Sequence, residues 1–270
     1  MELKEKIVNL YRRTANVLPE DVILALEKAE KIEDNPVAKE IFKKLIENTR
    51  EAKGEEKPIC QDTGTPYFYV EYPEGHTQKE LTEIIEEATI EATSGVPLRP
   101  NAVNCLTGKN IGNKPVIHFK EGKKLKINLM LKGGGSENVS AIYSLPNIDL
   151  KADRNLEGVR KCVLDAVFKA QGKACPPYII GVALAGNLEE AASISKKQLL
   201  RKLNDKNPEK ELFELEEKVL AEINELLIGP AGLGGKTTAL GVKIASGVRH
   251  PASFFVGIAI SCWAMRRQSL

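Results

Sequence analysis

The first fifty residues carry apolar side chains at helical spacing, with Lys and Glu on the opposite faces. Leu3 and Ile7, for example, stand four positions apart, as on one face of a helix. Pro19 and Pro36 each fall where a further helix would begin, because proline fits the first helical position. The pattern predicts a solvated N-terminal helical layer over about residues 1–50, without chemistry of its own.

Strand-like and helix-like stretches alternate through the rest of the chain. Strands are expected where β-branched and aromatic residues gather or alternate, at 67–72, 116–120, 125–131, 178–185, 239–245 and 254–260. Helices are expected at 77–95, 152–171 and 209–227, and from residue 188 onward. The short turn at 121–123 predicts that the two strands beside it form a hairpin.

These elements predict a mixed α/β fold, with an N-terminal helical layer and a mixed β-sheet with flanking helices. A chain of 270 residues is near the upper size for one hydrophobic core. No Gly/Ser-rich or Pro-rich linker divides it, so we expect a single domain over 1–270.

Composition excludes several classes of function. The formal net charge is +2 and aromatic residues make up 5% of the chain. Neither value favours binding to nucleic acid or to an anionic membrane surface. No window approaches about 18 uninterrupted apolar residues, and the first residues lack the apolar run of a signal peptide. We therefore expect a cytoplasmic protein without a membrane span.

The chain has five cysteines: Cys60, Cys105, Cys162, Cys175 and Cys262. The number is odd, and no two of them form a Cys-x-x-Cys pair, which argues against a disulfide framework and a zinc knuckle. Cys162 falls within a helical pattern, where packing is the simpler role. Each remaining cysteine is either a small core residue or a reactive thiol.

Cys60 belongs to the stretch 58–65, Pro-Ile-Cys-Gln-Asp-Thr-Gly-Thr. It places a soft metal ligand beside the Gln61 amide and the Asp62 carboxylate, ahead of a Thr-Gly turn. A thiolate binds soft metals and iron–sulfur clusters, and a neighbouring carboxylate can move a proton. The same residues also fit a buried cysteine followed by an Asx-type turn, so both interpretations stay open.

Two glycine-rich stretches are candidates for anion binding. Residues 132–138, Lys-Gly-Gly-Gly-Ser-Glu-Asn, follow a strand and form either a backbone donor site or a flexible turn. Residues 229–238 contain Gly-Lys-Thr, as in a phosphate-binding loop. However, Pro230 occupies the first glycine position and a helix precedes the stretch. A loop near an anionic ligand or cluster is favoured, with a nucleotide-binding protein as the alternative from another class.

Two further polar residues lie in irregular segments. Arg99 is the only arginine within 96–114, where it could clamp a carboxylate in bidentate fashion or simply be an exposed loop arginine. His250 lies in a loop just before an apolar strand, a common place for catalytic groups. A structural hydrogen-bonding role is its alternative.

Taken together, these stretches resemble the class I, iron–sulfur fumarate hydratases and the closely similar L-tartrate dehydratases. The resemblance rests on residues 59–65, 132–136, 174–178, 234–236, 249–250 and 257–262, which occur in the family's order. It implies the α subunit of a two-subunit hydro-lyase, equivalent to the N-terminal domain of one-chain members. The implied reaction is the reversible hydration of fumarate to L-malate, with L-tartrate dehydration as the alternative.

The resemblance also implies a cofactor. Cys60, Cys175 and Cys262 would ligate a [4Fe–4S] cluster. Three thiolates for four irons leave one iron open, and an open iron can act as a Lewis acid.

The substrate, a small dicarboxylate, would meet further residues by the same resemblance. Asp62 and His250 would be catalytic, and Gln61, Arg99, Gly134 and Gly135 would bind the substrate. One-chain members take a proposed general base and more cationic groups from their C-terminal domain. We therefore expect a hetero-oligomer whose β subunit carries the rest of the active site, and little or no activity from this chain alone.

Overall fold

The structure is a computed structural model that describes residues 2–96 and 98–270. Pro97, expected to lie just beyond a helix end, is outside the described residues, as is Met1. The chain divides into two compact units. The first unit comprises Met1–Pro19, Glu47–Gly134 and Ala264–Leu270, and the second comprises Glu20–Ile46 and Gly135–Trp263. The single-domain expectation stays a prediction, whereas the mixed α/β class is confirmed.

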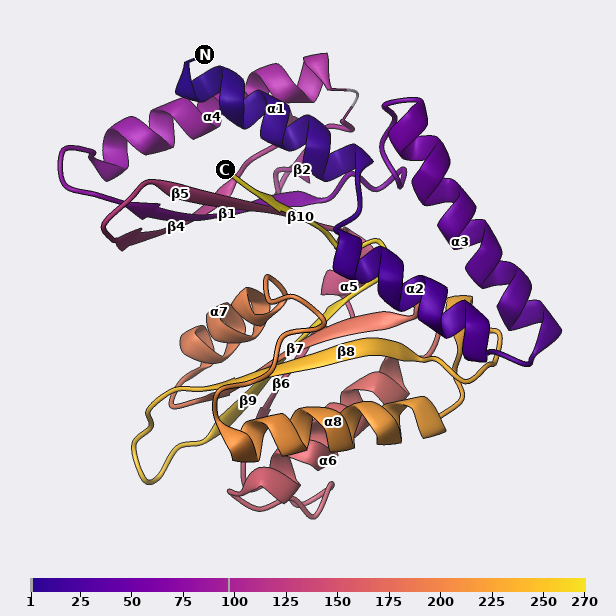
Figure 1. Cartoon of the computed structure of the whole chain (residues 1–270). Coiled ribbons are helices and arrows are strands. Elements are labelled where there is room, and N and C mark those ends of the chain that lie inside the picture. The colour runs from indigo at the N-terminus through magenta and orange to yellow at the C-terminus, as the bar shows by residue number, and fades with distance from the viewer. Residues whose placement is uncertain (1, 97) are drawn as a thin grey trace. The chain divides into compact units, whose positions relative to one another are not determined.

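The first unit contains a four-stranded sheet in the order β10-β5-β1-β4. Its strands are β1 (Thr65–Tyr72), β4 (Val116–Glu121), β5 (Lys126–Lys132) and β10 (Arg266–Ser269). Strand β1 pairs in parallel with β4 and antiparallel with β5, and β10 pairs antiparallel with β5. Helices α1 (Leu3–Asn16) and α4 (Gln78–Gly95) lie side by side along one face of this sheet (Figure 1).

The hairpin predicted across 121–123 is wrong in its pairing. Both strands form, but β1 lies between them. The Gly122 N–H donates to the Tyr72 carbonyl at 2.8 Å, so the turn closes onto β1. The buried side chains of β1, Phe68 and Val70 among them, explain this central position, because a strand with that pattern gains from neighbours on both sides.

The core of the first unit lies between this sheet and the two helices. Alternate residues of β1 and β5 meet one face of each helix. Buried members include Phe68, Val70, Ile127, Leu129, Ile7, Leu10, Tyr11, Leu81 and Ile85. Within the expected loop 96–114, β2 (Ala102–Val103) and β3 (Asn110–Gly112) form a small two-stranded arm.

The second unit contains a four-stranded sheet in the order β6-β9-β7-β8. Its strands are β6 (Ala141–Ser144), β7 (Tyr178–Ala185), β8 (Ala239–Ser246) and β9 (Phe255–Ser261). Strand β7 pairs in parallel with β8 and antiparallel with β9, and β6 pairs antiparallel with β9. Helix α7 (Leu188–Gln198) covers one face, and α6 (Leu156–Ala170) and α8 (Lys210–Glu225) cover the other (Figure 1).

The remaining elements are short or lie nearer the N-terminus. They are α2 (Glu20–Ile32), α3 (Pro36–Gly54), α5 (Gly134–Glu137) and the 3-10 turn η1 (Pro230–Gly232). Helix α2 packs against β8. Pro36 opens α3 as predicted, and the Asn35 side chain accepts the N–H groups of residues 37 and 38. No helix among the described residues is long and apolar enough to cross a membrane.

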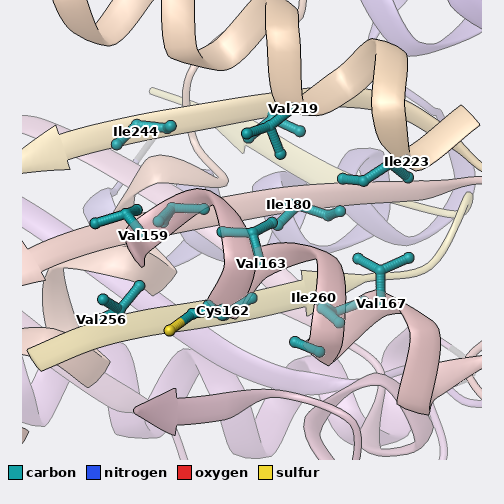
Figure 2. Packing of buried hydrophobic residues seen from close by; sticks show 14 of the residues in the cluster. Val159, Cys162, Val163, Val167, Ile180, Val219, Ile223, Ile244, Val256 and Ile260 are labelled. Atoms are coloured by element: carbon teal, nitrogen blue, oxygen red, sulfur yellow. The ribbon is translucent and has the colours of Figure 1, made fainter. Parts of the chain in front are cut away.

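The main core of the second unit lies between its sheet and helices α6 and α8. Figure 2 shows Val163 of α6 and Val219 of α8 against Ile180 and Ile260 of the sheet. On the opposite face, Gly181 and Gly257 admit α7 at backbone distance. A Cβ atom at Gly257 would stand 2.0 Å from the Ala191 carbonyl oxygen. The central strands β7 and β9 are therefore fixed from both sides.

Candidate active site

Cys60 stands at the exposed end of an anchored segment in the first unit. The preceding residue, Ile59, donates its N–H to the Ala15 carbonyl at 3.0 Å and accepts from the Asn48 amide at 3.1 Å. Ile59 is buried, whereas Cys60 is only half-buried and Gln61 is exposed. Cys60 is therefore not the buried cysteine of the alternative interpretation. The Asx-type turn that the same interpretation predicted does form.

That turn holds the Asp62 carboxylate between two backbone donors. Asp62 Oδ1 accepts the Gly64 N–H at 3.0 Å, and Oδ2 accepts the Gly134 N–H at 2.8 Å. Between them, Gly133 leaves the necessary space, because a Cβ atom there would stand 3.0 Å from Oδ2. The glycine run thus binds Asp62. The Gly134 N–H, expected to face substrate, is donated to this carboxylate.

Thr63 connects this turn to the loop that carries Arg99. The buried Thr63 hydroxyl oxygen accepts the Arg99 N–H at 3.1 Å and the Asn101 amide at 3.0 Å. The Arg99 side chain is exposed and has no ion-pair partner among the described residues. Its guanidinium group is therefore available to a carboxylate. Thr63 and Gly64 of the Thr-Gly turn connect the Arg99 loop to Asp62. The sequence pattern indicated only a turn at these two residues.

The second unit brings Cys175 and Cys262 together. Cys175 lies just before β7 and Cys262 just after β9, and these strands are antiparallel neighbours with Ile179 opposite Ser261. The Trp263 N–H donates to the Cys175 carbonyl at 3.2 Å, which joins the two segments directly. Cys175 is exposed and Cys262 is half-buried.

Tyr178 lies beside both of these cysteines and was not predicted as a site residue. Its hydroxyl donates to the Gln171 carbonyl at 2.5 Å. Burial, together with the charges of Cys175 and Cys262, raises the pKa of Tyr178 to about 12. The phenol therefore stays neutral near pH 7 and is a rigid, uncharged neighbour of the two thiols.

The glycine-rich loop 229–238 packs against the Cys175 segment and supports it. The Ala231 N–H donates to the Pro176 carbonyl at 2.9 Å. Gly172 and Gly232 face each other so closely that a Cβ atom at Gly232 would stand 2.5 Å from Gly172 Cα. Glu33 holds the other end of the loop, since its Oε2 accepts the Lys236 N–H at 2.7 Å. The loop is a structural support for a cysteine ligand candidate.

The same contacts argue against the nucleotide-binding alternative. A phosphate-binding loop must offer free backbone N–H groups to its ligand. Here the N–H groups of residues 229, 231–234, 236 and 238 all donate to protein acceptors. The Gly-Lys-Thr sequence is present, but the Lys236 N–H and most other backbone donors of the loop are already used.

Substituting Gly232 by alanine should therefore disturb the Cys175 segment. Gly232 has a φ of +76° and no room for a Cβ atom, so alanine adds backbone strain and a clash with Gly172. We expect Gly232→Ala to lower the melting temperature by roughly 5–10 °C and to reduce iron bound after reconstitution.

Gly75→Ala is the matched control for this prediction. Gly75 also has a positive φ, of +94°, but a Cβ atom there meets nothing within 4 Å. It should lower the melting temperature by only about 3 °C and leave iron binding intact. Equal effects of the two variants would contradict the supporting role of the loop.

His250 lies at the other end of β9 from Cys262. Its Nδ1 accepts the Ala252 N–H at 3.1 Å, so a neutral ring carries its proton on Nε2. Arg249 fixes this exposed turn by donating to the Pro251 carbonyl at 2.9 Å and by stacking over Phe254. Seven strand residues separate the turn from Cys262, and a strand of that length spans about 20 Å. The second unit does not bring these two predicted site residues together.

The two other cysteines differ from the ligand candidates. Cys162 is fully buried in the core of Figure 2, and burial raises its pKa to about 11. Cys105 lies on the exposed arm between β2 and β3. Among residues 2–96 and 98–270, no group of three His, Cys, Asp or Glu side chains is arranged to hold a metal ion. Cys60 belongs to one unit and the paired cysteines to the other, so the three-thiolate set stays a prediction.

Comparison with known proteins places this geometry in context. The family model described as fumarate hydratase (fumerase) matches residues 4–270. A "Putative fumarate hydratase class I" of Geobacillus stearothermophilus is 41% identical over 278 residues, which cover 98% of this chain and 54% of that protein. The chain thus spans about half the length of this relative.

Two further relatives match along most of their own length. A "Putative L(+)-tartrate dehydratase subunit alpha" of Methanocaldococcus jannaschii is 40% identical, covering 99% of this chain and 96% of that protein. An L(+)-tartrate dehydratase subunit alpha of Escherichia coli O157:H7 is 33% identical, covering 100% of this chain and 90% of that protein.

Proposed function

The chain belongs to the family of class I fumarate hydratases and L(+)-tartrate dehydratase α subunits, and on this basis we propose that it is the α subunit of a hydro-lyase acting on a four-carbon dicarboxylate. The proposed reaction is the reversible hydration of fumarate to L-malate. One observation carries the proposal most directly. The Asp62 carboxylate is held by two backbone donors beside half-buried Cys60 and beside the loop of exposed Arg99.

The proposed cofactor is a [4Fe–4S] cluster held by Cys60, Cys175 and Cys262. The donor chemistry fits, since thiolates are the usual cluster ligands and all three thiols lie at exposed or half-buried segment ends. When bound through three thiolates, such a cluster supplies an open iron that acts as a Lewis acid toward substrate oxygens. The five cysteines are present as thiols rather than as disulfides, and we propose a cytoplasmic location, where thiols stay reduced.

The exposed polar groups of the first unit would bind the substrate. Arg99 would pair with a substrate carboxylate through two parallel hydrogen bonds, the geometry for which a guanidinium group is suited. The exposed Gln61 amide would donate to or accept from a second substrate oxygen. Gly135, which follows Gly134 in the chain and belongs to the second unit, would contribute its backbone N–H.

Asp62 is the proposed proton carrier. Hydration adds a hydroxyl group to one carbon and a proton to its neighbour, so a group near the substrate must take a proton from water. Each Asp62 oxygen accepts one backbone N–H, and a carboxylate oxygen has a further lone pair to accept a proton. The two N–H donors fix the direction of those lone pairs, which is the purpose of preorganisation.

His250 fits this scheme only under a geometric condition. It lies about 20 Å along β9 from Cys262, too far to contact a substrate bound beside that cysteine in the same copy. In our proposal, the Nε2–H of His250 therefore donates to a substrate oxygen from a second copy of the chain.

A β subunit is the proposed partner. Two relatives that match nearly end to end are named α subunits, and the chain covers about half of the Geobacillus relative. We expect the isolated chain, reconstituted with iron and sulfide under anaerobic conditions, to hydrate fumarate at a negligible rate. Adding the β subunit should restore turnover, measured as the loss of fumarate absorbance. Full activity without the partner would contradict the proposal that the site is shared.

L-tartrate is the second candidate substrate, because the relatives carry both names. The same cluster and anion-binding groups would suit a 2,3-dihydroxy diacid. Comparing kcat/KM of the complex on fumarate, L-malate and L-tartrate decides between them. No turnover of any of the three by an iron-loaded complex would exclude both.

A further inference from the structure

Arg266 is one of the most deeply buried side chains of the first unit. It is the first residue of β10, opposite Leu131 of β5, and only 1% of it is exposed. Its Nη1 donates to the main-chain carbonyl of Asp62 at 2.7 Å. The guanidinium group therefore contacts the main chain of the turn that contains Asp62, the proposed proton carrier.

The Arg266 charge is poorly compensated for a buried group. Among the described residues, it forms no ion pair with a carboxylate, and its Nε finds no hydrogen-bond partner. Burying a cation without a paired anion is costly, and fully buried arginines are otherwise paired. A position that weakens the fold in this way is best explained by a role in the site beside it.

The free side of the guanidinium group faces the glycine run. A Cβ atom at Gly133 would stand 3.9 Å from Arg266 Nη2 and 3.0 Å from Asp62 Oδ2. The cation and the carboxylate thus border the same small space, which is kept open by the missing side chain. At such separations in a poorly solvated site, a positive charge stabilises a neighbouring anion.

We propose that Arg266 is a positioning residue for Asp62, an inference that rests on the proposed function of that carboxylate. Arg266 fixes the main chain of Asp62, while the N–H groups of Gly64 and Gly134 fix its two oxygens. Without Arg266, the turn loses one of three restraints, and the carboxylate loses its alignment with the substrate.

The effect should fall on turnover rather than on the cluster. Cys60 is anchored separately, through the hydrogen bonds that Ile59 makes with Ala15 and Asn48. Removing Arg266 leaves both of these bonds in place. Iron binding should therefore persist where the rate falls, and this separates a positioning role from a general loss of structure.

The test uses the iron-loaded complex with its β subunit and four variants: Arg266→Gln, Arg266→Lys, Asp62→Asn and the double variant Arg266→Gln/Asp62→Asn. We expect Arg266→Gln to lower kcat roughly 10- to 100-fold, the effect of a small misplacement of a catalytic group. KM should change less than about threefold and iron content should stay the same. Arg266→Lys should recover part of the rate, since it keeps the charge but not the planar donor pair.

The double variant gives the decisive comparison. If Arg266 acts through Asp62, the double variant is no slower than Asp62→Asn alone, whereas independent roles multiply. Arg13→Gln is the matched control, because Arg13 also donates to a main-chain carbonyl of this sheet, that of Ser269 at 3.2 Å, away from Asp62. It should leave kcat unchanged. The inference would be overturned if the two substitutions multiplied their losses of kcat in the double variant, or if Arg266→Gln lost iron.

A second readout does not depend on turnover. Amide hydrogen exchange at Gly64 and Gly134 should become faster in Arg266→Gln, because the turn that receives these N–H groups is loosened. Unchanged exchange would overturn the inference even if the complex turned over no diacid. Inactivity of the unsubstituted complex together with faster exchange would instead reject the proposed function and keep the role of Arg266.

Discussion

Replacing Cys60, Cys175 or Cys262 by serine is expected to abolish iron–sulfur cluster binding. A serine hydroxyl is a hard, neutral donor at pH 7 and does not replace a thiolate on iron. Loss of any one of three ligands leaves two, too few to hold the cluster in place. The measurement is iron and sulfide per chain, with the visible absorbance, after anaerobic reconstitution of the complex.

The two remaining cysteines are the controls for this prediction. Cys105→Ser changes an exposed arm, and Cys162→Ser changes a fully buried core position. Both should keep the full iron content. The Cys162 variant should unfold at a lower temperature, because a hydroxyl group buried without a partner costs roughly 1–3 kcal/mol, and Cys162→Ala separates that polar effect from the thiol itself. If all five serine variants lost iron alike, the ligand assignment would fail.

Asp62→Asn should lower kcat of the complex roughly 10²- to 10⁴-fold, the usual contribution of a positioned acid or base. An amide group keeps the size of the carboxylate but does not take up a proton near neutral pH. Since Asp62 is not proposed to bind the cluster, iron content should be unchanged. KM should change little, because Arg99 and Gln61 remain to bind the substrate.

The asparagine also alters one hydrogen bond, which calls for a control. Its amide nitrogen can face the Gly134 N–H, where an oxygen now accepts at 2.8 Å. Asp165→Asn is a matched change away from the site, since Asp165 accepts from Tyr143 at 2.7 Å and pairs with Lys169 at 2.6 Å. It should destabilise the second unit slightly and leave kcat intact. A rate loss of similar size in both variants would remove Asp62 from the mechanism.

Apolar periodicity predicted the buried elements of this fold. Strands β7 and β9 were expected within a residue or two of their bounds, because continuous apolar runs of that length fit a buried strand. Strand β10 was missed because its residues, Arg-Arg-Gln-Ser, have no strand-like pattern. It is a strand through pairing with the edge of β5, and pairing of distant segments is not encoded in local sequence.

The candidate site was only partly predictable for the same reason. The resemblance to a family supplied the residues, but the contacts that place them come from tertiary structure. Thr63 looked like an ordinary turn residue, yet its hydroxyl fixes the loop of Arg99. Arg266 stands in a polar stretch, Arg-Arg-Gln-Ser, with no pattern to mark it, yet it is buried and donates to the Asp62 carbonyl. Polar residues with a structural role give no periodic signal to distinguish them from solvated ones.

The interleaved segments of the two units have a consequence for biosynthesis. Residues 264–270 complete the sheet of the first unit, and they follow the whole of the second unit in the chain. Because a ribosome releases the chain from its N-terminus onward, that sheet gains β10 only after the second unit has been translated. The turn bearing Asp62 therefore acquires its Arg266 restraint only after the second unit has been translated. In a nascent chain, the proposed cysteine ligands would emerge before the proton carrier is fixed in position.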